Sequence, residues 1–157
     1  MSTQTLTSHH SHNASTPEEL TQGLLRYWLF DKQIVVYKAT ASSREVVDAW
    51  IDSVKDVMRN WSKTQPYLVI HDFRDHNIAF SPYARSRAAE LIKVGVHVPG
   101  YAAIVLPQNF VSTVIRLFMR TQKSHGIENR LYFDFEEGLT WLESKMGRLT
   151  SNSTPQR

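Results

Sequence analysis

The sequence predicts a single α/β domain with a mixed sheet of four to five strands. Two aromatic and β-branched runs, at residues 24–30 and 34–39, come first and are typical of a β-hairpin. Helical apolar spacing and short apolar runs then alternate three times, and an acidic stretch opens a last helix. With 157 residues, 41% of them hydrophobic, the chain is long enough to bury one core without disulfides or metal. The expected order is therefore a hairpin, three helix and strand alternations, and a C-terminal helix.

We expect the folded domain to span residues 20–148. Residues 1–19 are rich in Ser, Thr and His, and residues 149–157 are also polar, so both ends are typical of disordered segments. The leader lacks a basic start and an apolar run, which excludes a secretory signal. Since no stretch approaches the roughly 20 apolar residues of a membrane-spanning helix, we expect a cytoplasmic protein that is not transmembrane.

The hairpin comes first in the predicted sheet. The polar residues 31–33 between its two runs suit a turn, so the two strands should be antiparallel. We expect the hairpin strand at one edge of the sheet. Because an exposed edge invites pairing, a homodimer is an open alternative, which Arg26, Lys32 and Lys38 would oppose.

The first helix follows directly. Ser42 and Glu45 fit a capping box that would start it. Apolar residues then recur at helical spacing: Val47, Trp50, Ile51, Val54, Met58 and Trp61. Residues 67–70 are a short continuous apolar run, typical of a central strand that is covered on both faces.

The second helix should begin at Ser81 and Pro82, because serine can cap free amides and proline is favourable at the first helical position. We expect it to run over residues 82–94 and to be followed by a strand at 101–106. A third helix is marked by apolar residues at helical spacing: Phe110, Val111, Val114, Ile115 and Phe118. It should end near Gly126.

The last strand is predicted at residues 131–133. Asp134 and Glu137 then form a second capping box. The buried face of the final helix would consist of Phe135, Leu139, Leu142 and Met146. Each strand, helix and strand step is short enough for a right-handed crossover, so the later strands should be parallel.

Three stretches resemble a known family: the hairpin, the strand leading into Asp72 and Phe73, and the acidic ending at residues 136–142. They are similar to the STAS domain, the fold of bacterial anti-sigma factor antagonists, and especially to its SpoIIAA-like relatives. The resemblance covers roughly residues 24–145. It implies a STAS/SpoIIAA-like fold and a non-enzymatic signalling module of bacterial type that works by binding another protein.

Ser81 matches the hydroxyl that a partner kinase phosphorylates in the antagonists, although Phe80 precedes it where they have Asp. Two interpretations stay open. Ser81 could simply cap the second helix. As a phosphosite it would place a dianion at a helix N-terminus, with Arg74 and Arg85 as partners.

The resemblance also predicts the surface that binds the partner protein, which could be a kinase or another regulator. It would comprise the loop that follows the central strand and the second helix. Its residues are Asp72, Arg74, Asp75, His76, Tyr83, Arg85 and Arg87.

The same loop is where a metal or a catalytic pair could sit, because ligands usually bind at the carboxyl ends of strands. The metal candidates of a metal-assisted hydrolase are His71, Asp72, Asp75 and His76, since imidazole and carboxylate suit zinc, iron or manganese. An Asp and His acid–base pair is an alternative, and turn-capping Asp residues are another. Neighbours such as His71 and Asp72 point to opposite faces of an extended segment. We assign no catalytic residue, metal or cofactor.

Arg116, Arg120 and Lys123 follow one another at spacings of four and three and form a basic stripe on one helix face. A solvated helix face explains such a stripe, and so does an acidic protein partner or an anionic lipid surface. The formal charge of +3 is small, and no aromatic residues interleave the stripe, so we do not expect nucleic-acid binding.

Trp28 and Phe30 on the hairpin raise a last alternative. They could pack under the final helix, or they could border an apolar groove beside the sheet. The second hypothesis for function is therefore a carrier of a small ligand or lipid with an apolar pocket, as in CRAL-TRIO domains. The chain has no cysteine, which excludes thiolate chemistry and Cys-ligated metal.

Overall fold

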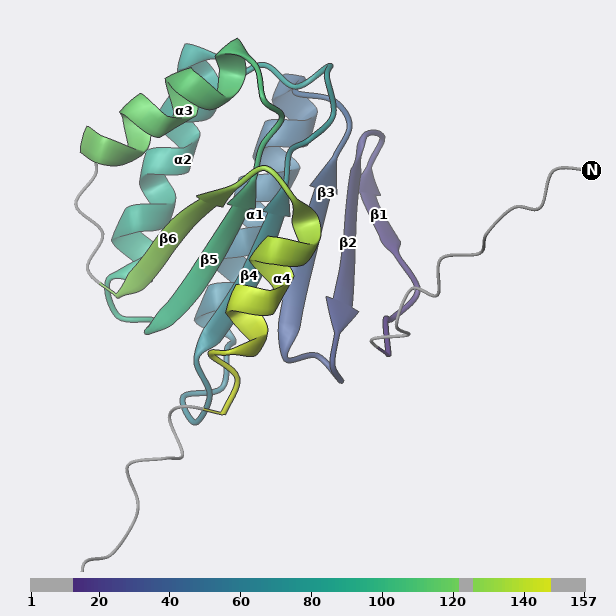
Figure 1. The fold of residues 1–157 in the computed structure, drawn as a ribbon, viewed down its shortest axis with the longest axis vertical. Helices are drawn as coiled ribbons and strands as arrows, with labels where there is room; N and C mark the ends of the chain where they lie inside the picture. The colour runs from purple at the N-terminus through teal and green to yellow at the C-terminus, as the bar shows by residue number, and fades with distance from the viewer. Residues whose placement is uncertain (1–12, 122–125, 148–157) are drawn as a thin grey trace, which may run out of the picture.

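The computed structural model describes residues 13–121 and 126–147, which form one six-stranded sheet with helices on both faces (Figure 1). In chain order the elements are β1 (Glu18–Thr21), β2 (Leu24–Leu29), β3 (Ile34–Ala39), α1 (Arg44–Arg59), β4 (Tyr67–Asp72), α2 (Pro82–Gly95), β5 (Gly100–Val105), α3 (Phe110–Thr121), β6 (Ile127–Tyr132) and α4 (Phe135–Glu143). Figure 1 shows α4 alone on the near face of the sheet and α1, α2 and α3 on the far face. The α/β class is confirmed.

The sheet is mixed, and its strands lie side by side in chain order. β1, β2 and β3 are antiparallel, whereas β3 to β6 are parallel. The expectation of four to five strands is wrong, because β1 adds a strand outside the hairpin. β1 is four residues long and largely polar, and it begins at Glu18, within the residues expected to form the leader. Glu18 forms an ion pair of 2.7 Å with Arg26 of β2. This charged contact joins β1 to the sheet, and it leaves no apolar pattern in the sequence from which the strand could be predicted.

β6 is longer than expected and begins at Ile127 rather than at residue 131. Its first half contains Glu128, Asn129 and Arg130, which conceal the strand in the sequence. The reason is its position: among the described strands β6 pairs with β5 alone, so it is an edge strand that tolerates polar side chains.

The N-cap residues of the helices are those expected from the sequence, with one exception. The N-cap of α1 is Ser43 rather than Ser42. Ser42 instead accepts a hydrogen bond from the backbone amide of Ala79 at 3.0 Å, which ties the start of α1 to the loop before α2. Ser81 caps α2 and Asp134 caps α4, as expected.

The face under α4 is a dense apolar layer. Its buried residues are Ile34, Val36, Leu68, Ile70, Ala103, Val105, Leu139, Trp141 and Leu142. α4 approaches β5 closely at Gly138, since a Cβ atom built there would lie 3.3 Å from the Cβ of Ala103. Close approach of helix and strand therefore leaves little space on this face.

The opposite face is covered by α1, α2 and α3. α1 packs on the sheet through Val54 and Met58. α2 is clamped to α1 by Arg87, which pairs with Asp48 at 3.0 Å and with Asp52 at 2.7 Å. α3 meets β5 through the buried Ile115, in a small cluster with Ile104 and Leu106. These supports hold the three helices over the sheet and position the site described next.

Among the described helices, none combines the length and the apolar character that crossing a membrane requires.

Candidate functional site

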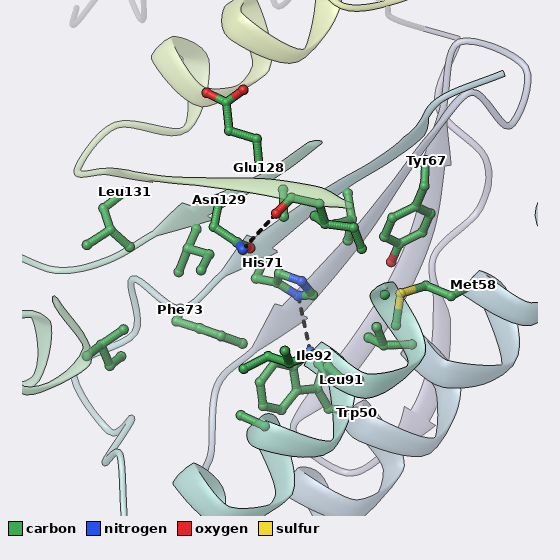
Figure 2. Close-up of a pocket in the computed structure, with 18 of the residues that line it drawn as sticks. Trp50, Met58, Tyr67, His71, Phe73, Leu91, Ile92, Glu128, Asn129 and Leu131 are labelled. Carbon is green, nitrogen blue, oxygen red and sulfur yellow. Dashed lines mark hydrogen bonds between the residues drawn. The ribbon is translucent and has the colours of Figure 1, made fainter. Parts of the chain in front are cut away.

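A cavity of about 520 Å³ lies between the sheet and helices α1, α2 and α3 (Figure 2). Its lining is mainly apolar and includes Met58, Val69, Phe73, Leu91 and Ile104. Small-molecule sites in proteins commonly occupy roughly 300–1,000 Å³ and are lined in this way. The cavity therefore has the size and lining of a site for a small organic molecule.

Small side chains on facing elements explain why this space is not filled. Ala102, in the middle of β5, lies between Val69 of β4 and Asn129 of β6 in the strand register. On the helix side, Ala88 and Gly95 of α2 also line the cavity. Because both the floor and the wall lack side-chain volume, a hollow forms where a Leu or Phe would otherwise fill the core.

His71 of β4 points into the cavity and is 6% exposed. Its Nδ1 accepts a hydrogen bond from Nε1 of Trp50 at 3.1 Å (Figure 2). Burial lowers the pKa of His71 to about 3, so the ring is neutral at neutral pH. A neutral ring that accepts at Nδ1 carries its proton on Nε2. Nε2 is then a donor, and it has no hydrogen-bond partner within the described part of the chain.

Aromatic neighbours fix the orientation of the His71 ring. Trp50 meets it edge-on, with ring centroids 5.5 Å apart. Phe73 and Tyr37 stack near it at 5.8 and 5.9 Å. A ring held from several sides presents its Nε2 proton in one direction, as a preorganised donor does.

Tyr67, at the start of β4, supplies a second polar group. The side chain is 1% exposed, and its hydroxyl has no hydrogen-bond partner in the described residues. Among the described residues, two other buried side-chain atoms also have no hydrogen-bond partner: Nε of Arg26 and Nε1 of Trp141. Neither of these residues lines the cavity. A buried hydroxyl without a partner costs roughly 1–3 kcal/mol. Burial also raises the pKa of Tyr67 well above its ordinary value, so the hydroxyl keeps its proton.

Polar and charged groups from β6 and α3 complete the lining. Asn129 donates to the backbone oxygen of Ile127 at 3.4 Å, a long bond that leaves its amide oxygen available (Figure 2). Arg116 and Arg120 project from α3 and are exposed. The cavity thus has an apolar interior with neutral polar groups and a basic rim.

The loop after β4 does not assemble the expected metal ligands. His71 faces the cavity, whereas Asp72 is buried on the opposite face, where Arg74 grips it with two hydrogen bonds of 2.8 and 2.9 Å. Asp75 and His76 lie beyond the strand, and the His76 side chain is 88% exposed. Within residues 13–121 and 126–147, no three His, Asp or Glu side chains come close enough to hold a metal ion together. The four candidates are therefore not one site.

Asp72 instead belongs to the α4 side of the sheet. The Arg74 guanidinium that pairs with it lies 5.4 Å from the ring centre of Phe135. Burial, together with the Asp72 charge, raises the pKa of Tyr27 to about 12. This cluster ties the end of β4 to the start of α4.

The expected partner-binding residues on α2 divide into two groups. Arg87 and Tyr83 face α1: Arg87 bonds Asp48, Asp52 and Glu90, and the Tyr83 hydroxyl donates to Asp48. The hydrogen-bond donors of Arg87 and Tyr83 are thus already used by carboxylates of this protein. Arg85, by contrast, is exposed and remains open to a partner.

Ser81 is partly exposed, and its side chain accepts a hydrogen bond from the amide of Ala84 at 3.1 Å. Both of its interpretations, cap and phosphosite, stay compatible with this geometry. In the basic stripe, Arg116 and Arg120 lie at the cavity rim, and Lys123 lies outside the described residues.

The hairpin aromatics do not border the cavity. Trp28 stacks on Trp61 with ring centroids 6.0 Å apart, and Phe30 packs against the layer under α4. Of the two alternatives for these aromatics, Phe30 follows the first, packing under the final helix, whereas Trp28 packs beside Trp61. The cavity lies instead over β4, β5 and β6. Tyr67 and Ala102 were not predicted as site residues, because each looks like an ordinary apolar residue of a strand.

A scan against protein-family models, a search of curated proteins and a search of solved structures each found no match for this chain.

Proposed function

We propose that this protein binds a small, mainly apolar molecule in the cavity between the sheet and α1 to α3. The observation that carries the proposal is the hydroxyl of Tyr67, buried in the lining of an apolar cavity without a hydrogen-bond partner in the described residues. A ligand oxygen would supply the missing bond. The neutral Nε2–H of His71 offers a second donor in the same lining.

The chemistry of these groups favours binding over catalysis. With a pKa of about 3, His71 is a poor general base at neutral pH, because effective bases have pKa values near the working pH. Tyr67 likewise keeps its proton. Two fixed neutral groups in an apolar wall are suited to a carbonyl, ether or hydroxyl oxygen on an apolar body.

The test is binding of a neutral apolar reporter, N-phenyl-1-naphthylamine, followed by fluorescence. We expect saturable binding by the wild type and at least about tenfold weaker binding by Ala102→Leu, because the added carbons occupy the cavity. Ala89→Leu, the same change on α2 outside the cavity lining, is the control and should bind like the wild type. Absence of binding, or equal binding by wild type and Ala102→Leu, would contradict the proposal.

A second candidate is the regulatory module of STAS or SpoIIAA-like type. It is favoured by the position of Ser81, a partly exposed hydroxyl at the start of a helix whose first turn contains Arg85 and no acidic residue. Protein isolated from its producing cell would then carry a phosphate increment in its mass, absent in Ser81→Ala and retained in Ser86→Ala. Equal partner binding by the phosphorylated and unphosphorylated forms would remove this candidate.

A further inference from the structure

The basic rim of the cavity consists of arginines that form no ion pair in the described residues, unlike several other arginines of the chain. Elsewhere, several arginines form ion pairs with carboxylates: Arg26, Arg74, Arg87 and Arg130. Arg116 and Arg120 line the rim, and neither pairs with a carboxylate of the described residues. Their spacing of four places both on one side of α3. The rim therefore holds two guanidinium groups with unused hydrogen-bond donors.

The acidic neighbour at the rim does not neutralise them. Glu128 of β6 borders the cavity, but its carboxylate pairs with Arg130 at 3.1 Å. Arg116 instead lies over the ring of Phe133, 5.4 Å from its centre. This aromatic contact places the guanidinium next to the end of β6 while its donors stay available.

The interior of the cavity, unlike its rim, favours an uncharged part of a ligand. Among the described residues that line the cavity, the cations are Arg116 and Arg120, and the inner polar groups, on Tyr67 and His71, are neutral. A charged group placed among the inner walls would lose its hydration without an opposite charge, which is costly. A ligand charge is therefore favourable only at the rim, where Arg can bind a carboxylate or phosphate in a forked geometry.

We infer that the ligand is an amphiphilic anion, with an apolar body in the cavity and a carboxylate or phosphate head group held by Arg116 and Arg120. This inference rests on the proposed function and adds the charge and the orientation of the ligand. The apolar end then lies toward Tyr67, and the head group faces solvent between α3 and β6.

The test measures the binding of three probes that share an unbranched alkyl chain: laurate, dodecyl phosphate and dodecanol. Binding is measured by calorimetry below the aggregation concentration of each probe. We expect both anions to bind the wild type more tightly than dodecanol. The double variant Arg116→Gln with Arg120→Gln should weaken anion binding about tenfold, because exposed charge contacts contribute modestly, and should leave dodecanol binding unchanged. Arg44→Gln with Arg59→Gln removes the same charge from exposed sites outside the cavity lining, and Arg44 lies over the Tyr83 ring as Arg116 lies over Phe133, so this control should change neither.

The outcomes separate this inference from the proposed function. Equal binding of anions and dodecanol, unaffected by the rim variant, overturns the inference and leaves the cavity function in place. Loss of all binding in Ala102→Leu, with charge selectivity in the wild type, supports both. If none of the three probes binds, both fail.

A second arm separates uptake of a free amphiphile from attraction to a bilayer. The protein is sedimented with phosphatidylglycerol vesicles and with phosphatidylcholine vesicles. The inference expects laurate binding without sedimentation. Cosedimentation with the anionic vesicles alone, together with no binding of free laurate, would assign the two arginines to a membrane surface and contradict it.

Discussion

The two faces of the sheet are built from alternate residues of the same strands, yet they are packed in different ways. Under α4, Leu139 and Leu142 are at most 1% exposed and fill the layer above β4 and β5. Under α1 to α3, a cavity of about 520 Å³ contains the buried hydroxyl of Tyr67 and the neutral ring of His71. One face is therefore packed throughout, whereas the other leaves the space in which we propose that a ligand binds.

Two adjacent alanines of β5 show how this difference arises. Ala103 is small because α4 approaches it at Gly138, so its size allows close contact. Ala102 is equally small, but the cavity lies over it. The same residue type is therefore found in dense packing on one face, where Gly138 lets α4 approach closely, and at a hollow on the other.

The largest expected effect that would test this comparison is on the packed face. Leu142→Ala removes a fully buried side chain and should lower the free energy of unfolding by about 4 kcal/mol. Leu91→Ala, in the cavity lining, should cost about 1 kcal/mol or less, because that side chain already borders empty space. Urea denaturation of both variants measures the difference, and equal losses would mean that the two faces are packed alike.

The second test uses pH, because His71 lies on the cavity face. Its pKa in the folded state, about 3, is below the ordinary value near 6.5, so the unfolded chain takes up the proton first as pH falls. The stabilisation is complete above pH 6.5 and is lost toward pH 3. Between pH 7 and pH 4, wild type should lose about 3 kcal/mol more stability than His71→Phe. Nitrogen NMR of the ring should show Nε2 protonated and Nδ1 bare at pH 5; a doubly protonated ring there would refute the argument.

The two alanines provide the third test. Ala103→Leu should lower the free energy of unfolding by about 2 kcal/mol, because α4 leaves no room for added carbons. Ala102→Leu is the matched change on the other face and should alter stability by less than about 1 kcal/mol, since the cavity accepts the side chain. Thermal or urea unfolding distinguishes them. Larger destabilisation by Ala102→Leu would show that the hollow is not available to a side chain.

The smallest expected effect concerns the two buried tyrosines of the cavity-side layer. Tyr67→Phe removes a hydroxyl without a partner in the described residues and should stabilise the empty protein by about 1 kcal/mol. Tyr37→Phe removes a hydroxyl that is 3.0 Å from the Ser53 hydroxyl and should destabilise it by about 1 kcal/mol. Opposite signs in urea unfolding support the assignment of Tyr67 to a ligand; destabilisation by both changes would indicate a hidden partner for Tyr67.

How much of the fold could be predicted depends on where each strand lies. β3, which is apolar apart from Lys38, is found at residues 34–39, as expected, and the Ser81 and Asp134 caps are confirmed. β1 and the first half of β6 escaped prediction because edge strands tolerate polar residues and so lack the apolar signal. The sheet is thus predictable at its centre and obscure at its two edges.

The site could be predicted only in part. His71 stands out in the sequence by its chemistry, but its neighbour Asp72 suggested a metal ligand pair that the two faces of β4 separate. Tyr67 and Ala102 look like ordinary strand core. A cavity is missing volume between segments distant in the sequence, so no local pattern of apolar residues reports it.

The position of α4 after β6 has a consequence for synthesis of the chain. A ribosome adds roughly 5–20 residues per second, so the six described strands are made before α4, which covers the near face of the sheet (Figure 1). Until residues 135–143 emerge, Ile70 and Val105 have no helix above them. A nascent chain that stalls after β6 would therefore present an adhesive apolar surface to chaperones.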